Sequence, residues 1–161
     1  MVNGQLQVAG AAYAAQLIEH DANGERDTLL LEMKDAYPAA TGLQSLRRRL
    51  TLHRPGAAAE AAAAPHGWVE VADAFEFAEG PAPFESALTT FDNVTVGENA
   101  VLINGLRGEL RVGFDPEAVA ARLERHEDVE FENGPRAVNR IVFWPIEDRQ
   151  RGVVRLEIVP V

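Results

Sequence analysis

Apolar and polar residues alternate along much of the chain in short segments, which recur about every ten residues. Gly, Asn, Asp and Pro gather between these segments, where they indicate turns. Such a pattern is typical of an all-β sandwich or barrel. We therefore predict strands over 5–9, 12–19, 27–34, 44–54, 67–78, 83–90, 99–104, 107–114, 136–144 and 152–159.

The segment 116–126 departs from this pattern. Asp115 could cap a helix and Pro116 suits a first helical position, so local propensity favours one short helix near 116–126. Val119 and Leu123 nevertheless share one parity, which suits a strand if the surrounding sheet overrides propensity. The residues leave both alternatives open.

Three consecutive arginines interrupt the apolar side of the segment 44–54. Arg48 has the parity of the leucines in that segment, and Asp73 stands at the apolar parity of 67–78. If the two segments form a hairpin, Arg48 faces Asp73 across it. The alanine-rich stretch 56–67 between them has no periodicity, and it predicts a flexible hairpin connection.

Asp35 continues the apolar series of the segment 27–34, so it adds a third charge to the predicted cluster of Arg48, Asp73 and Asp35. A guanidinium and carboxylates can satisfy each other where a lone buried charge could not. The cluster could be a substrate clamp or a site with perturbed pKa values. We adopt the structural interpretation, an ion cluster that fixes strand register.

Length and charge narrow the possible functions. A chain of 161 residues is long enough for one domain with its own core, and we expect a single domain over 1–161. The formal net charge of −10 argues against nucleic acid and anionic membranes as partners. There is neither a long apolar run nor a basic leader, so we expect no membrane span and no signal peptide.

The common catalytic and metal-binding motifs are absent from the sequence. The chain has no cysteine, and its four histidines lack metal-ligand spacing, so we expect no metal site. The binding candidates are Arg47, Arg49 and His53, which share the outward parity and form a local basic stripe. This stripe could bind a carboxylate-bearing sugar, or it could exchange charges with neighbouring strands. Exposed tryptophans, Trp68 or Trp144, could stack on sugar rings.

Three stretches together resemble the C-terminal β-sandwich of heparinase II/III-like polysaccharide lyases: VNGQLQ at 2–7, MKDAYPAATGLQSLRRRLTLHR at 33–54 and GWVEVADAFEF at 67–77. The resemblance implies a two-layer antiparallel β-sandwich of the supersandwich or jelly-roll type, in which 116–126 is a strand. It further implies packing against an N-terminal helical toroid of the same enzyme. Such enzymes cleave acidic, uronate-containing polysaccharides by β-elimination.

The resemblance brings no catalytic residue, cofactor or metal ligand to this chain. In the family the acid–base groups come mainly from the toroid, and the histidines associated with a metal precede the sandwich strands matched here. We therefore expect an accessory sandwich domain of a larger lyase, periplasmic or secreted, without catalysis of its own. The alternatives are a stand-alone carbohydrate-binding or protein-interaction module, and a small enzyme using Asp35, Tyr37 and Arg48.

Overall fold

The computed structural model describes residues 1–55 and 66–161, and its regular structure is β-strand with two short 3-10 turns. The turns are η1 (Lys34–Ala36) and η2 (Ala39–Thr41). The strands are β1 (Gln16–Ala22), β2 (Arg26–Glu32), β3 (Leu43–His53), β4 (Trp68–Phe77), β5 (Ser86–Thr90), β6 (Asn93–Val96), β7 (Ala100–Gly105), β8 (Gly108–Gly113), β9 (Val119–Val129), β10 (Arg136–Pro145) and β11 (Arg151–Pro160). None of the described residues forms a helix long and apolar enough to cross a membrane.

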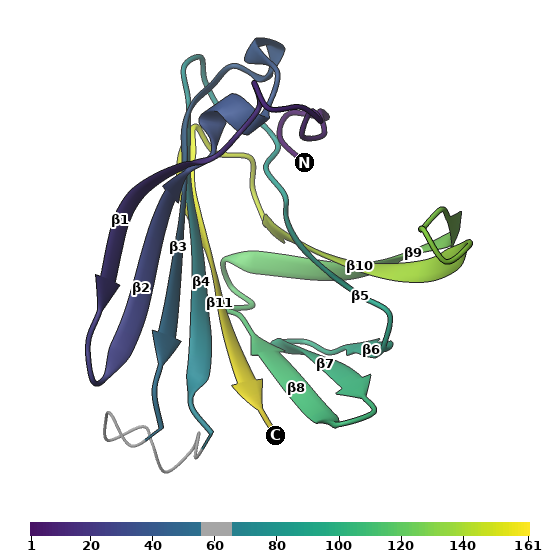
Figure 1. Ribbon diagram of the computed structural model, residues 1–161. Helices are drawn as coiled ribbons and strands as arrows, with labels where there is room; N and C mark the ends of the chain where they lie inside the picture. The colour runs from purple at the N-terminus through teal and green to yellow at the C-terminus, as the bar shows by residue number, and fades with distance from the viewer. Residues whose placement is uncertain (56–65) are drawn as a thin grey trace.

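The strands form two antiparallel sheets that pack as a sandwich, as predicted. The large sheet has eight strands in the order β1-β2-β3-β4-β11-β8-β7-β6, and the small sheet has three in the order β5-β10-β9. Figure 1 shows β1, β2 and β3 together at the left, while β9 and β10 extend to the right. The second layer is therefore much narrower than the first.

The core lies between the two sheets, where alternate side chains of each strand point inward. Its largest fully buried side chains include Phe77 and Leu156 from the large sheet and Phe143 and Ile141 from the small sheet. Phe75 of β4 stacks on Phe84, just before β5, with ring centroids 4.3 Å apart. These contacts place the small sheet over β4 and β11.

The inner face of the large sheet is covered only in part. Leu29 of β2, Leu50 of β3, Val71 of β4 and Leu156 of β11 form one row across it, because each is the register partner of the next. Exposure falls from 36% at Leu29 to 5% at Val71 and 0% at Leu156. The inner face of β1, β2 and β3 thus carries apolar side chains that the small sheet does not cover.

The predicted hairpin of 44–54 and 67–78 corresponds to β3 and β4, which pair from Leu43 opposite Phe77 to His53 opposite Trp68. Residues 56–65, most of its predicted connection, lie outside the described part of the chain. The prediction of a strand at 5–9 is wrong. The strand predicted at 12–19 lies at Gln16–Ala22 instead. The strand β6 was not predicted, because its stretch of the sequence indicated only a turn.

The helix alternative for 116–126 is wrong, and the strand alternative is confirmed. Asp115 accepts a hydrogen bond from the Glu117 amide at 3.0 Å, but it closes a turn and begins no helix. From Val119 onward the segment pairs with β10, so the sheet supplies its backbone hydrogen bonds. Val119 is also buried in the core, and this tertiary packing outweighs the helix propensity of the alanines around it.

Candidate functional site

A polar pocket of about 170 Å³ opens between the two sheets at the edge strand β5. Side chains from both sheets and from the amino-terminal segment line it. The polar and charged groups that decide its chemistry are Met1, Tyr37, Arg48, Asp73, Glu85 and Arg140. This convergence of charges from distant parts of the chain makes the pocket the candidate functional site.

Arg48 and Asp73 form a buried ion pair in the lining of the pocket. They are register partners in β3 and β4. The Arg48 Nε donates to Asp73 Oδ1 at 2.7 Å, and Arg48 Nη2 donates to Asp73 Oδ2 at 2.6 Å. Ser86 of β5 adds a hydroxyl donor to Asp73 Oδ2 at 2.6 Å. Asp73 is only 1% exposed, so this buried carboxylate has both a charge partner and satisfied oxygens.

The pairing also fixes the charge on Arg48. The hydrogen bond to Asp73 raises the pKa of the Arg48 guanidinium, and this gain exceeds the opposing effect of burial. Two of its donor nitrogens are occupied by one carboxylate in a bidentate geometry. The pair, together with Ser86, therefore joins β3, β4 and β5 across the layers, and Asp73 neutralises the charge of Arg48.

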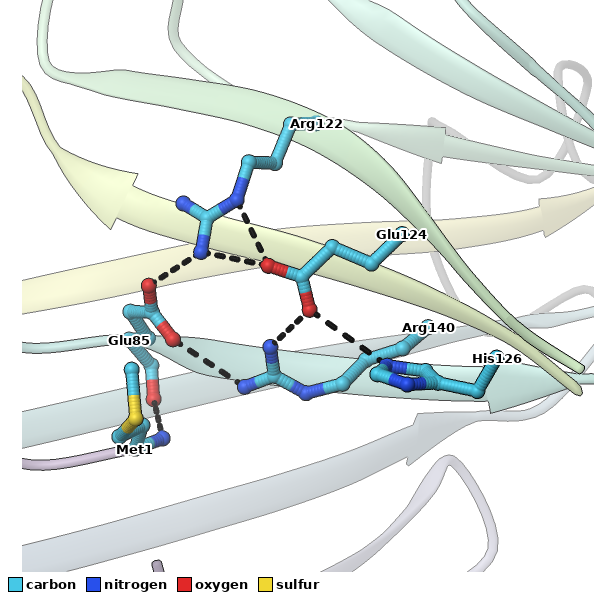
Figure 2. Close-up of polar contacts among 6 residues, drawn as sticks. All are labelled: Met1, Glu85, Arg122, Glu124, His126 and Arg140. Atoms are coloured by element: carbon cyan, nitrogen blue, oxygen red, sulfur yellow. Dashed lines mark hydrogen bonds and ion pairs between the residues drawn. The ribbon is translucent and has the colours of Figure 1, made fainter. Parts of the chain in front are cut away.

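A second cluster of charges lies where β5, β9 and β10 meet, and Figure 2 shows its members. Glu85 accepts from Arg122, and its other oxygen accepts from Arg140 at 3.2 Å. Glu124 in turn accepts hydrogen bonds from Arg140 Nη1 at 2.6 Å and from Arg122 Nε at 2.9 Å. The two carboxylates and two guanidinium groups thus alternate in a closed ring, with His126 Nε2 at 3.7 Å from Glu124 on its rim.

The ring holds both glutamates in their ionised form. Burial would raise the pKa of Glu85, but hydrogen bonds from Arg122 and Arg140 outweigh it and lower that pKa below its ordinary value. The same balance, with Arg140 as the stronger partner, lowers the pKa of Glu124. Neither carboxyl group is poised to donate a proton near neutral pH.

The amino terminus closes one side of the pocket. The Met1 amine donates to the Glu85 carbonyl at 2.9 Å, and the Glu85 amide donates to the Met1 carbonyl at 2.8 Å. Val2 forms a bridge with Phe84 and is fully buried. Burial lowers the pKa of the Met1 amine. Residues 1 and 2 therefore start a short antiparallel strand beside the beginning of β5.

The structure does not bring Asp35, Tyr37 and Arg48 together as the active site of a small enzyme. Asp35 lies in η1 with an exposed side chain, so the expectation that it joins the ion cluster is corrected, and Ser86 supplies the third group instead. Tyr37 does line the pocket, but burial raises the pKa of its phenol. A phenol that keeps its proton near neutral pH is a poor general base.

The predicted basic stripe lies on the outer face of the large sheet, away from this pocket. Arg47 Nε is 3.3 Å from Glu32 Oε2, and Arg49 Nη2 is 3.8 Å from Glu19 Oε2. Arg47 therefore faces a carboxylate of the adjacent strand β2, and Arg49 faces one of β1, the next strand along the sheet. This arrangement matches the alternative in which the stripe exchanges charges within the sheet.

His53, the third residue of the stripe, stacks on Trp68 with ring centroids 3.8 Å apart and an interplanar angle of 6°. Its Nε2 is buried without a hydrogen-bond partner among the described residues. Trp144 is covered in part by Arg122, whose guanidinium carbon lies 4.8 Å from the ring centroid. One face of each tryptophan is thus already occupied by a side chain of this protein.

The described residues contain no group of three or more His, Asp or Glu side chains that could hold a metal ion. The second cluster was not predicted from the sequence. Its one signal was Arg140, which has the apolar parity of Val138 and Val142 in β10. The partners of Arg140 could not be identified while 116–126 was open between helix and strand.

The sequence matches no protein-family model and no curated protein. Solved structures of lyases share its fold. The heparan sulfate lyase HepC from Pedobacter heparinus has a TM-score of 0.63 and 14% identity over 91% of this chain, and a mutant of that enzyme has a TM-score of 0.59 and 13% identity over 91%. Heparinase III has a TM-score of 0.54 and 14% identity over 92%. The chain spans only 21% of the length of each of them, so it has the fold of one part of such a lyase.

Proposed function

We propose that this chain is an accessory β-sandwich domain of a heparinase II/III-like polysaccharide lyase. In this proposal it forms the C-terminal part of the enzyme and supports a cleft whose acid–base groups come from a helical toroid. The full enzyme would cleave uronate-containing polysaccharides by β-elimination. The fold, which matches about a fifth of each lyase compared, supports this assignment.

The observation that carries the proposal is the uncovered inner face of β1, β2 and β3. Leu17, Leu29 and Leu52 are 61%, 36% and 44% exposed on strands whose neighbours are core strands. Exposed apolar side chains gathered on one sheet face are typical of an interaction site in soluble proteins. A domain that works alone would gain nothing from leaving one side of its core open, whereas a domain that supports another needs such a surface.

The chemistry of the pocket is consistent with a supporting role. Arg48 is bound to Asp73, and Arg140 is bound to two glutamates, so the cations are neutralised within the chain. Abstraction of the proton beside a uronate carboxylate needs a base with a pKa near the working pH. Tyr37 does not meet that requirement, because burial raises its pKa.

An activity assay on two proteins tests the proposal. The purified chain and the product of the complete reading frame that contains it are each incubated with heparan sulfate, and the ultraviolet absorbance of unsaturated uronate products is followed. We expect absorbance to rise only with the product of the reading frame, and we expect that product to contain a helical domain. A rise with the chain alone would contradict the accessory role.

The same samples address the alternative of a stand-alone carbohydrate-binding module. Calorimetric titration of the chain with heparan sulfate oligosaccharides should give no measurable heat of binding, because Arg47 and Arg49 already face carboxylates. Saturable binding that Arg47→Ala abolishes would favour the module, provided that a matched Arg151→Ala variant on the exposed part of β11 still binds.

A further inference from the structure

The strand β5 has an unpaired edge. It is the terminal strand of the small sheet, with β10 as its only strand neighbour among the described elements. Successive residues of a strand direct their backbone groups to alternate sides. Glu85 exchanges both of its backbone hydrogen bonds with Met1 on the side away from β10. Ala87 and Thr89 therefore direct their N–H and C=O groups to that same side, where the described sheet has no strand to receive them.

Met1 and Val2 pair with the residues just before β5, on the side of its unpaired edge. Val2 lies opposite Phe84, and Met1 lies opposite Glu85, in antiparallel register. A segment that continued this line past the Met1 amine would next reach Ala87 and then Thr89. The edge of β5 can thus pair with a further strand, and the contact between Met1 and Glu85 fixes the register of that pairing.

The space beside this edge is the pocket described above. Ala87 lines it together with Leu46 and Met33, and Arg48 is also part of its lining. The register continues from Arg48 to Leu31 of β2 and then to Leu17 of β1, which is 61% exposed. The pocket therefore borders the uncovered apolar face that supports the proposed function.

We propose that the free edge of β5 is a strand-acceptor site, which an extended segment that joins Met1 to the partner domain occupies in the register begun by Met1 and Val2. The inference rests on the proposed function for the identity of the partner. The segment would carry small or apolar side chains at alternate positions, because the charged groups of the pocket are already paired with one another. Backbone hydrogen bonds would supply the affinity, and the apolar positions would supply the specificity.

The intact chain, extended before Met1 by a short strand of alternating threonine and valine, tests the acceptor site. Hydrogen exchange of the Ala87 and Thr89 amides is measured for this protein and for a chain with a glycine–serine extension of equal length. We expect the strand-forming extension to slow both amides about tenfold or more, and the glycine–serine extension to leave them unchanged. Equal exchange rates in the two proteins would overturn the proposal.

A matched variant separates edge pairing from general stabilisation. Ala87→Pro removes an outward-facing donor, and proline is tolerated on the solvent side of an edge strand. We expect this variant of the unextended chain to keep its melting temperature and the extended variant to lose the protection of Thr89. If Ala87→Pro does not fold, Thr89→Pro is tested in the same way with Ala87 as the reporter.

Ultracentrifugation of the unextended chain identifies a competing occupant. A monomer with fast-exchanging Ala87 and Thr89 amides is expected. A dimer in which these amides are already protected would assign the edge to a second copy of the chain and would overturn the assignment to a partner domain. Neither readout uses a polysaccharide, so failure here is distinguishable from failure of the lyase proposal.

Discussion

Arg48 of β3 and Asp73 of β4 lie opposite each other and share two hydrogen bonds, at 2.7 Å and 2.6 Å, between the layers of the sandwich. Removing the guanidinium would leave a carboxylate that is 1% exposed without its charge partner. We expect Arg48→Ala to lower the free energy of unfolding by about 3 kcal/mol, because a buried charge is left uncompensated. Urea unfolding measures this loss.

The control for this prediction is Arg47→Ala on the adjacent residue. The Arg47 side chain is 60% exposed and pairs with Glu32 at the surface. Such a pair contributes about 0.5 kcal/mol or less. Similar losses for the two variants would show that the buried pair has no special role in stability.

Ser86→Ala should have a smaller effect than Arg48→Ala. The Ser86 hydroxyl is buried and donates to Asp73 at 2.6 Å, but Arg48 continues to satisfy the carboxylate when that hydroxyl is lost. We expect a loss of about 2 kcal/mol by urea unfolding, within the usual range for removing one hydrogen bond to a charged group. A loss as large as that of Arg48→Ala would place the main partner of Asp73 on β5 instead.

The ring of Figure 2 predicts a decrease in stability in acid. The folded state lowers the pKa of Glu85 and Glu124 below the ordinary value of 4.5. Their contribution to stability is therefore fully present above about pH 4.5 and is lost as the pH falls through the lowered folded-state values. Unfolding measured between neutral and acidic pH should show this decline, and the double variant Glu85→Gln, Glu124→Gln should show a flatter one. An unchanged slope in the variant would remove the ring from the explanation.

The partial cover of the large sheet predicts unequal costs for the same substitution within one row. Leu156→Ala should lose about 3 kcal/mol, because its side chain is fully buried. Leu29→Ala should change stability by about 0.5 kcal/mol or less, because much of its side chain is already in water. Leu29→Ala should also reduce binding of a hydrophobic dye to the folded chain. Equal losses at both positions would indicate that the small sheet extends over β2.

The Arg48–Asp73 pair could be predicted from the sequence because both residues belong to one hairpin, whose register follows from local alternation. Asp35 was placed in the cluster because the alternation of β2 was extended past its end, where η1 turns the chain away. The ring of Glu85, Arg122, Glu124 and Arg140 was not predictable in this way. It depends on pairing between β5, β9 and β10, and Glu85 and Arg140 are 55 residues apart in sequence.

The helix alternative for 116–126 was wrong for a related reason. Alanine and glutamate favour a helix in an isolated segment, but the neighbouring edge of β10 offers this segment hydrogen-bond partners that a local reading cannot see. Within the small sheet, β5 and β10 were predicted from the sequence, and β9 was the strand that the sequence defined least.

The bridge between Val2 and Phe84 has a practical consequence for handling the protein. An affinity tag joined ahead of Met1 would start next to the Glu85 backbone, at the border of the pocket between the layers. Val161 at the other end is 74% exposed. Tags, dyes and surface tethers are therefore best attached after the last residue, and a protease site placed before the first would be cut slowly.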